Sequence, residues 1–155
     1  MTPRRLDPDV VGRRLRLLRD TLGDLEPLRG VPPERFAREP LTRAAAERLM
    51  QVAVDLAVDI NGHIAVAESA HAPMTGRASF EMAAAAGAID RAVADRLAPA
   101  AGLRNLLIHR YADLDVDLVA TAVDEVLDGF AEYVTQVAAF LRSRVTGARP
   151  TDAAG

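Results

Sequence analysis

The sequence of 155 residues contains no cysteine, no tryptophan and few aromatic residues of any kind. Without cysteine the chain forms neither disulfide bonds nor thiolate metal sites, and this absence agrees with a cytoplasmic protein. Aromatic residues make up only 4% of the chain, whereas half of its residues are hydrophobic and alanine is abundant. This composition favours closely packed helices over sheets, because alanine has the highest helix propensity.

Long hydrophobic runs are missing as well. No apolar run approaches the ~20 residues that a membrane-spanning helix needs. The N-terminal residues lack the apolar core of a signal peptide. We therefore expect a cytoplasmic protein that has no membrane partner.

The sequence also lacks an excess of positive charge, since its formal net charge is −3. This argues against a protein that coats nucleic acid in general, because such proteins carry many more basic than acidic residues. Any contact with nucleic acid must therefore be local, around Arg104, Arg110 and the basic residues that the fold brings near them.

Hydrophobic residues recur at helical spacing along the chain, and no segment shows strand-like alternation. We predict an all-α fold, an up-and-down bundle of about five helices over residues 1–145, with a flexible tail over 146–155. The first helix should begin with Asp7 as N-cap and Pro8 at the first helical position. The other segments expected to be helical are 33–39 as a short turn, 42–69, 80–86, 89–97, 100–111 and a last helix that ends near 145.

Two helix starts are predicted from capping residues. Thr42 is the expected N-cap of the second long helix, with Leu41 placed to contact Ala46 as a hydrophobic staple. Ser79 is the expected N-cap of the short helix that follows, and Phe80 beside it should fill the core.

Two further features flank residues 103–111. Pro99 is expected to kink the chain or to restart the helix there, because proline lacks a backbone amide proton. Asp113, Asp115 and Asp117 are interpreted as caps of the last helix, where carboxylates are favoured by the helix dipole. Their spacing does not match a calcium-binding loop.

A stripe of polar residues runs along the second long helix, formed by Gln51, Asp55, Asp59 and His63 at intervals of four. Two carboxylates and a histidine at this spacing are one candidate for a metal site, although two or three ligands from one helix make a weak case. A hydrogen-bonded polar seam between helices is the favoured interpretation. A third interpretation is that Asp59 and His63 contact the residues of an active site and hold them in position.

The most distinctive stretch is 103–111, which places Arg104, Asn105, His109 and Tyr111 in an otherwise aliphatic, alanine-rich region. On a helix, Arg104 and Tyr111 lie on one flank, whereas Asn105 and His109 lie on the other. The core face is expected to consist of Leu103, Leu106 and Leu107, with Ile108 roughly opposite. An apolar residue surrounded by these polar pairs suits a surface that meets a second copy of the chain or a ligand.

The chemistry of this stretch fits cleavage of a phosphodiester. Histidine exchanges protons near neutral pH, and the planar guanidinium of arginine matches a phosphate. The 2′-hydroxyl of RNA would supply the nucleophile, and the arginine would stabilise the charged transition state without a metal. The plainer interpretation is that His109 packs or caps a helix end and Arg104 is solvated.

The spacing of these residues resembles the Arg-x4-6-His signature of the HEPN superfamily. In its Arg-x4-His-x-Tyr form it resembles the HepT-like toxins, which are ribonucleases paired with a nucleotidyltransferase antitoxin of the MntA type. The resemblance extends over roughly 44–141. Its weaker matches are Gln51, Asp59, His63, Ser79, Phe80 and the turn over 87–89.

The resemblance implies a helical bundle that dimerises through the motif helix, with Arg104, Asn105 and His109 as catalytic residues. His109 would be the general acid and base, Arg104 would stabilise the transition state, and Asn105 would orient the histidine or the phosphate. A straight helix separates Arg104 and His109 by about 140°, so a two-fold axis near Ile108 would bring the pair together from two chains. The product would carry a 2′,3′-cyclic phosphate, and no metal or other cofactor is implied.

The same resemblance implies a type VII-like toxin–antitoxin pair in which the antitoxin adds AMP to Tyr111. Added bulk and negative charge beside Arg104 would block the site. The resemblance also favours Asp59 and His63 as supporting residues. The alternative is a non-catalytic HEPN helical module that binds a partner nucleotidyltransferase, and a structural helical dimer without chemistry is a third interpretation.

Overall fold

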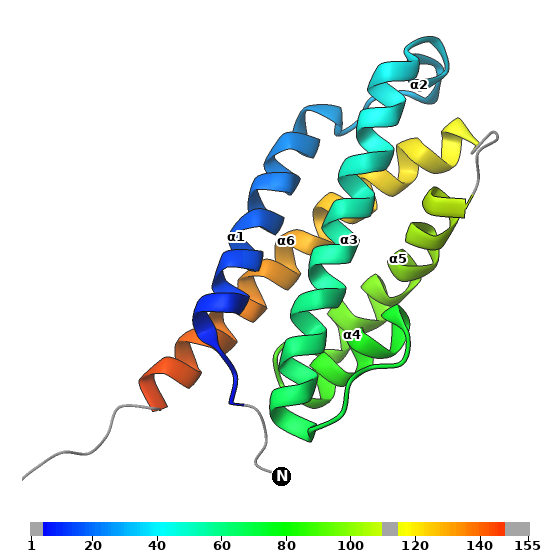
Figure 1. Ribbon diagram of the computed structural model, residues 1–155. Helices are drawn as coiled ribbons and strands as arrows, with labels where there is room; N and C mark the ends of the chain where they lie inside the picture. Colours follow the sequence, from blue (N-terminus) through cyan, green and yellow to red (C-terminus); the bar gives the residue numbers. More distant parts are fainter. Residues whose placement is uncertain (1–4, 110–114, 148–155) are drawn as a thin grey trace, which may run out of the picture.

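The computed structural model describes residues 5–109 and 115–147, without the side chains of Ile108 and His109. Within these residues every regular element is helical, which confirms the predicted all-α class. The elements, labelled in Figure 1, are α1 (Pro8–Leu25), the 3-10 turn η1 (Glu26–Leu28), α2 (Pro33–Arg38), α3 (Pro40–Ser69), α4 (Gly76–Ala85), α5 (Arg91–His109) and α6 (Val116–Gly147). The long helices α1, α3, α5 and α6 run alternately up and down, as predicted (Figure 1).

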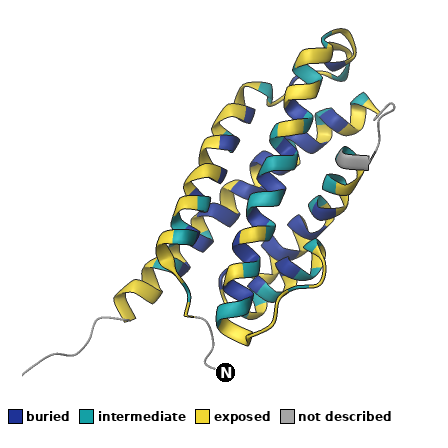
Figure 2. Cartoon of the chain, viewed as in Figure 1, coloured by how far each residue is buried: buried dark blue, intermediate teal, exposed yellow. Residues whose placement is uncertain are grey.

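Helix α3 is the centre of the bundle, because it contacts α1, α4, α5 and α6. The buried faces of these helices point toward one another (Figure 2). By length and composition α3 is also apolar enough to cross a membrane, a point that the sequence analysis did not anticipate. This is weak evidence for a membrane span, since Met50, Ile60 and Ile64 of α3 are fully buried in the protein core.

The predicted start of the first helix is confirmed. The carboxylate of Asp7 accepts hydrogen bonds from the backbone amides of Asp9 and Val10, at 3.0 and 3.3 Å. Pro8 is the first residue of α1. An N-cap carboxylate satisfies amide groups that have no partner inside the helix, which explains why the helix begins here.

Two other predicted helix starts are wrong. Helix α3 begins at Pro40, because proline fits a first helical position, so Thr42 lies inside the first turn and Leu41 is 87% exposed. Helix α4 begins at Gly76 with Thr75 as its N-cap, since the Thr75 hydroxyl accepts the amide of Ala78 at 3.0 Å.

Of the two outcomes expected at Pro99, a restart of the helix does not occur. Helix α5 continues through Pro99 from Arg91 to His109, and Pro99 itself lies on an exposed face. At the next helix, the Asp115 carboxylate accepts the amide of Asp117 at 2.9 Å, in line with its predicted capping role. Asp113 lies outside the described residues.

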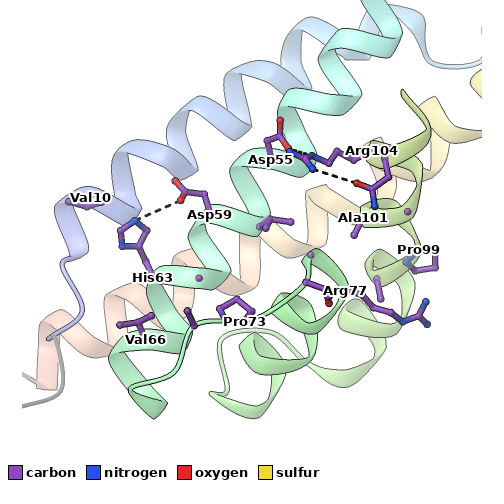
Figure 3. Close-up of a pocket in the computed structure, with 18 of the residues that line it drawn as sticks. Val10, Asp55, Asp59, His63, Val66, Pro73, Arg77, Pro99, Ala101 and Arg104 are labelled. Carbon is purple, nitrogen blue, oxygen red and sulfur yellow. Dashed lines mark hydrogen bonds and ion pairs between the residues drawn. The ribbon is translucent and has the colours of Figure 1, made fainter. Parts of the chain in front are cut away.

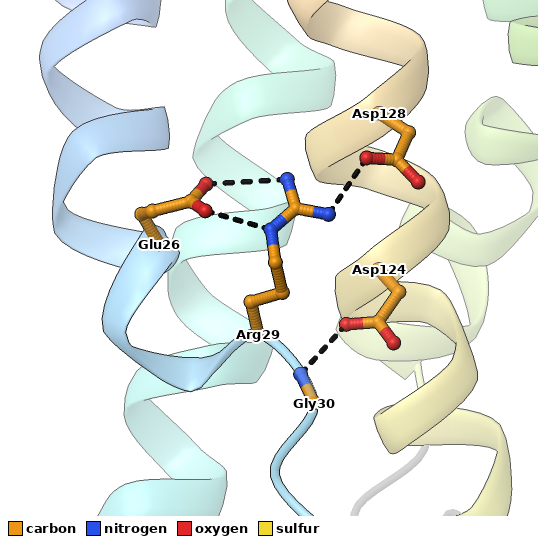
Figure 4. Close-up of polar contacts among 5 residues, drawn as sticks. All are labelled: Glu26, Arg29, Gly30, Asp124 and Asp128. Atoms are coloured by element: carbon orange, nitrogen blue, oxygen red, sulfur yellow. Dashed lines mark hydrogen bonds and ion pairs between the residues drawn. The ribbon is translucent and has the colours of Figure 1, made fainter.

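The connection between α1 and α2 is bound to α6 by polar contacts (Figure 4). Arg29 donates from Nη1 to Asp128 at 2.7 Å and from Nε to Glu26 at 2.7 Å. The backbone amide of Gly30 donates to Asp124 at 3.0 Å. Gly30 has a positive φ of 69°, a conformation that glycine adopts without strain, so the chain turns here toward α2.

The core contains an aromatic cluster and one buried polar network. Phe80 is fully buried, as predicted, and its ring lies 6.5 Å from Phe130 and 6.2 Å from Tyr133 between centroids. The Tyr133 hydroxyl donates to Asn61 at 2.7 Å, and Asn61 donates to Ser79 at 3.2 Å. Burial raises the pKa of the Tyr133 phenol, which keeps it neutral and able to donate.

Replacing Asn61 with alanine should lower the free energy of unfolding by about 1–3 kcal/mol, because the Tyr133 hydroxyl would lose its best acceptor while it stays buried. Urea unfolding followed by circular dichroism measures this loss. In a Tyr133→Phe background the same change should cost less, since no buried hydroxyl then depends on the longer contact to the Ala57 carbonyl at 3.3 Å. An equal loss in both backgrounds would contradict this role of the network.

Candidate functional site

The distinctive stretch of the sequence lies in the second half of α5, and its arginine faces α3. Arg104 donates from Nε to Oδ1 of Asp55 at 2.5 Å, and both side chains are about 40% exposed, at 41% and 40%. A second, longer contact joins Arg104 Nη1 to Oδ1 of Asn105 at 3.5 Å. Figure 3 shows the Asp55 carboxylate and the Arg104 guanidinium facing each other between the two helices.

This contact uses one edge of the guanidinium and leaves another available. Asp55 occupies Nε, whereas Nη2 has no hydrogen bond among the residues that the structure describes. A guanidinium binds a phosphate through pairs of parallel N–H donors. Arg104 is therefore held by Asp55 and still presents its Nη groups to an anion.

The periodicity of α5 places Arg104 and Asn105 on a side of the helix that is buried earlier in the chain. Two turns earlier on the helix, the same two positions are taken by Leu97 and Ala98, which are 2% and 5% exposed. The side of α5 that is buried at Leu97 and Ala98 thus becomes polar two turns later. There Arg104 is half-buried and Asn105 is exposed, and both border a cavity.

The predicted core face of the motif is only partly correct. Leu103 and Leu107 pack against the core, but Leu106 is 40% exposed. Leu106 lies instead in a shallow apolar groove of about 390 Å³ that also contains Leu118 of α6, itself 42% exposed. The position of the helix in the bundle, and not its own pattern, decides which leucine is covered.

The polar stripe of α3 connects this helix to its two neighbours. Asp55 pairs with Arg104 of α5, and Asp59 pairs with Arg14 of α1. His63 lies 4.0 Å from Asp59 between Nε2 and Oδ1, as Figure 3 shows. This arrangement agrees with the favoured interpretation of a polar seam between helices.

Among the described residues, no three histidine or carboxylate side chains converge in a way that would hold a metal ion. The carboxylate that contacts Arg104 is Asp55, one turn before Asp59. Sequence reasoning placed Asp55 in the stripe but did not connect it with Arg104. Nothing in one sequence indicates which turn of α3 lies level with a given turn of α5.

The remaining motif residues are described only in part. His109 is the last residue of α5, and its backbone is helical. Its side chain, like the whole of Tyr111, lies outside the described residues, and so the predicted roles of both stay predictions.

A cavity of about 1040 Å³ extends from Arg104 and Asn105 toward the N-terminus of α1 and the start of α4. Figure 3 shows its lining, including Asp59 and His63 of α3 and Pro99 of α5. Binding pockets for small ligands commonly have volumes of about 300–1,000 Å³, so this one has the size of a binding site. It combines apolar walls with charged side chains that come from several helices.

Comparison with known proteins identifies relatives over most of the chain. The family described as "Ribonuclease HepT-like" matches residues 18–137. A protein named tRNA nuclease HepT, from Aphanizomenon flos-aquae, is 27% identical over 136 residues, which cover 88% of this chain and 92% of that protein. A protein named mRNA nuclease HepT, from Shewanella oneidensis, is 29% identical over 90 residues, which cover 58% of this chain and 68% of that protein.

Solved structures share the fold. A toxin–antitoxin crystal structure with AMP-PNP matches with a TM-score of 0.75 and 21% identity, over 84% of this chain and 98% of that one. A tri-AMPylated Shewanella oneidensis HEPN toxin in complex with its MNT antitoxin also matches with a TM-score of 0.75, at 22% identity and the same coverage. At these identities the likeness demonstrates a common HEPN-type helical fold.

Proposed function

The chain belongs to the ribonuclease HepT-like family, and from this premise we propose that it is a metal-independent endoribonuclease, the toxin of a toxin–antitoxin pair. The observation that carries the proposal is the position of Arg104. It borders a cavity of suitable size, Asp55 holds it, and its Nη2 is available to a phosphate. The sequence completes the set with His109 and Tyr111 at the family spacing.

The proposed reaction is transesterification by the RNA itself. His109 takes the proton of a 2′-hydroxyl while that oxygen attacks the adjacent phosphorus, and the Nη groups of Arg104 stabilise the negative charge that develops. The bond from phosphorus to the 5′-oxygen breaks, and this oxygen takes up a proton. Asn105, next to Arg104, orients the phosphate or the histidine. The products are a 2′,3′-cyclic phosphate and a 5′-hydroxyl.

We further propose that the active enzyme is a homodimer joined through α5. Arg104 and His109 are separated by about 140° around one helix, so a second chain is needed to aim both at one phosphate. The exposed leucines Leu106 and Leu118 support this, because they leave an apolar groove beside the motif. Burial of such a groove against a second copy favours association.

Regulation by a nucleotidyltransferase is proposed by analogy with the structural relatives. One of them is an AMPylated toxin in complex with an MNT antitoxin. Tyr111 is the motif tyrosine here, and AMP attached to it would bring a phosphate close to Arg104. Asp59 and His63, which border the same cavity, stay proposed supporting residues. All of these events are expected in the cytoplasm.

The test is cleavage of RNA by the purified chain in the presence of excess EDTA. We expect cleavage to persist. The products should carry 2′,3′-cyclic phosphate ends, which a cyclic phosphodiesterase converts to monophosphates. Loss of activity in EDTA and its return with added magnesium would contradict the metal-independent mechanism. Failure to cleave RNA, together with tight binding to a nucleotidyltransferase of the MNT type, would favour the non-catalytic HEPN module.

A further inference from the structure

The cavity beside Arg104 is open because small residues form much of its lining. Gly62 of α3 and Gly102 of α5 both border it, and a methyl group added to either would meet no atom within 4 Å. Ala98 and Ala101 of α5 also contribute to the wall. Larger side chains at these positions would fill the space. The cavity volume therefore depends on the small size of these residues.

The charges that line the cavity are unequally engaged. Asp55 pairs with Arg104, Asp59 pairs with Arg14, and Asp7 caps α1. Arg77, in the first turn of α4, has no hydrogen bond or ion pair among the residues that the structure describes. The charge available to a ligand is therefore positive, although the whole chain has a net charge of −3.

The walls between the two arginines are apolar. Ala101 and Pro99 of α5 separate Arg104 from Arg77 in Figure 3, and Pro73 and Val66 line the cavity farther from both arginines. Rigid apolar surfaces of this kind suit the face of a nucleobase or a ribose, whereas they offer little to an ion alone. An arginine on either side of this apolar wall matches a nucleotide with a phosphate on either side.

We propose that this cavity binds the RNA nucleotide adjacent to the scissile phosphate, and that Arg77 contacts the next phosphate along the strand. This inference rests on the proposed ribonuclease function, because Arg104 fixes the position of the scissile phosphate. It extends that function by assigning the path of the strand, from α5 across α3 toward α4. The contacts involve backbone phosphates and apolar walls, so the site discriminates little between bases.

Binding of a fluorescently labelled single-stranded RNA, measured by anisotropy, tests this assignment. The protein carries His109→Ala so that the RNA remains intact. Arg77→Ala should raise the dissociation constant about fivefold at moderate salt and reduce the slope of log Kd against log salt by about 0.7, the value of one single-strand phosphate contact. Arg38→Ala is the matched control, since Arg38 is exposed in the last turn of α2 and does not border the cavity.

A second pair of variants tests the volume itself. Gly62→Leu adds a side chain whose Cβ meets no atom within 4 Å and raises the helix propensity of α3, so we expect weaker binding without unfolding. Gly23→Leu makes the same change in α1, where the added Cβ also meets no atom within 4 Å but lies outside the cavity. We expect only Gly62→Leu to weaken RNA binding.

Unchanged RNA binding by both Arg77→Ala and Gly62→Leu would overturn the assignment, as would equal weakening by the two control variants. A chain that binds no RNA would overturn it as well. The binding measurement needs no chemistry. If binding shows the expected pattern while the wild type fails to cleave RNA, the proposed catalytic function is wrong and the nucleotide site stands.

Discussion

Replacing either Arg104 or His109 with alanine is expected to abolish the growth arrest that the wild-type chain causes when it is expressed without a partner gene. The reason lies in the two roles proposed for these side chains. A lost donor to a developing anion slows a reaction by roughly 10²–10³-fold, and a lost general acid–base by about 10²–10⁴-fold. RNA cleavage by the purified variants should fall accordingly.

The comparison requires that all variants fold and accumulate equally. Arg104 is about 40% exposed and its pair with Asp55 lies at the surface, so its removal should cost little stability. Arg104→Lys keeps the positive charge but loses the planar set of donors, and we expect it to remain nearly inactive. If Arg104→Ala and His109→Ala stop growth as the wild type does, these residues do not form the active site.

Tyr111→Phe completes the same experiment. It should arrest growth as the wild type does, because the hydroxyl has no proposed part in cleavage. With a partner nucleotidyltransferase of the MNT type co-expressed, the wild type should become harmless, whereas Tyr111→Phe should stay toxic because it cannot accept AMP. Rescue of both chains by the partner would place the modification elsewhere.

The helices of this protein were largely predictable because local chemistry determines them. Asp7 and Pro8 begin α1 through capping, and Phe80 is buried because an aromatic residue in an apolar helix face has no better environment. The failures were also local in origin. Thr42 and Ser79 have the chemistry of N-caps, but Pro40 and Thr75 precede them and begin the helices earlier.

The site was predictable only as a set of residues, and not as an arrangement. The spacing identified Arg104 and the polar stripe of α3, since both follow from helical periodicity. The spacing did not indicate that Arg104 pairs with Asp55 or that Leu106 is exposed. Both depend on how α5 is rotated and shifted against α3 and α6. Such offsets arise from the packing of the whole bundle, which a single sequence does not reveal.

The pair formed by Asp55 and Arg104 leads to a second prediction with a large effect. Asp55→Ala should lower kcat about 10–100-fold with little change in KM. The carboxylate accepts the Nε proton of Arg104 at 2.5 Å and so restricts the rotamers of the guanidinium. A catalytic group displaced by about 1 Å costs up to 10²-fold in rate. Asp55→Asn keeps an oxygen that accepts the same proton, and it should recover most of the activity.

A matched control comes from another arginine–aspartate pair between elements, Arg29 with Asp128 (Figure 4). Its carboxylate is 51% exposed, compared with 40% for Asp55, and it lies outside the cavity. Asp128→Ala should therefore leave cleavage unchanged. Full activity of Asp55→Ala would contradict a positioning role.

An increase in the rate of Asp55→Ala would reveal the opposite role for the carboxylate, as a competitor that keeps Arg104 from the phosphate. The geometry argues against such competition. Asp55 occupies Nε, whereas the phosphate is expected at the Nη groups, so both anions fit the same guanidinium at once. A carboxylate bound in this way aligns the cation without blocking it. The sign of the change in kcat thus distinguishes a carboxylate that positions Arg104 from one that restrains it.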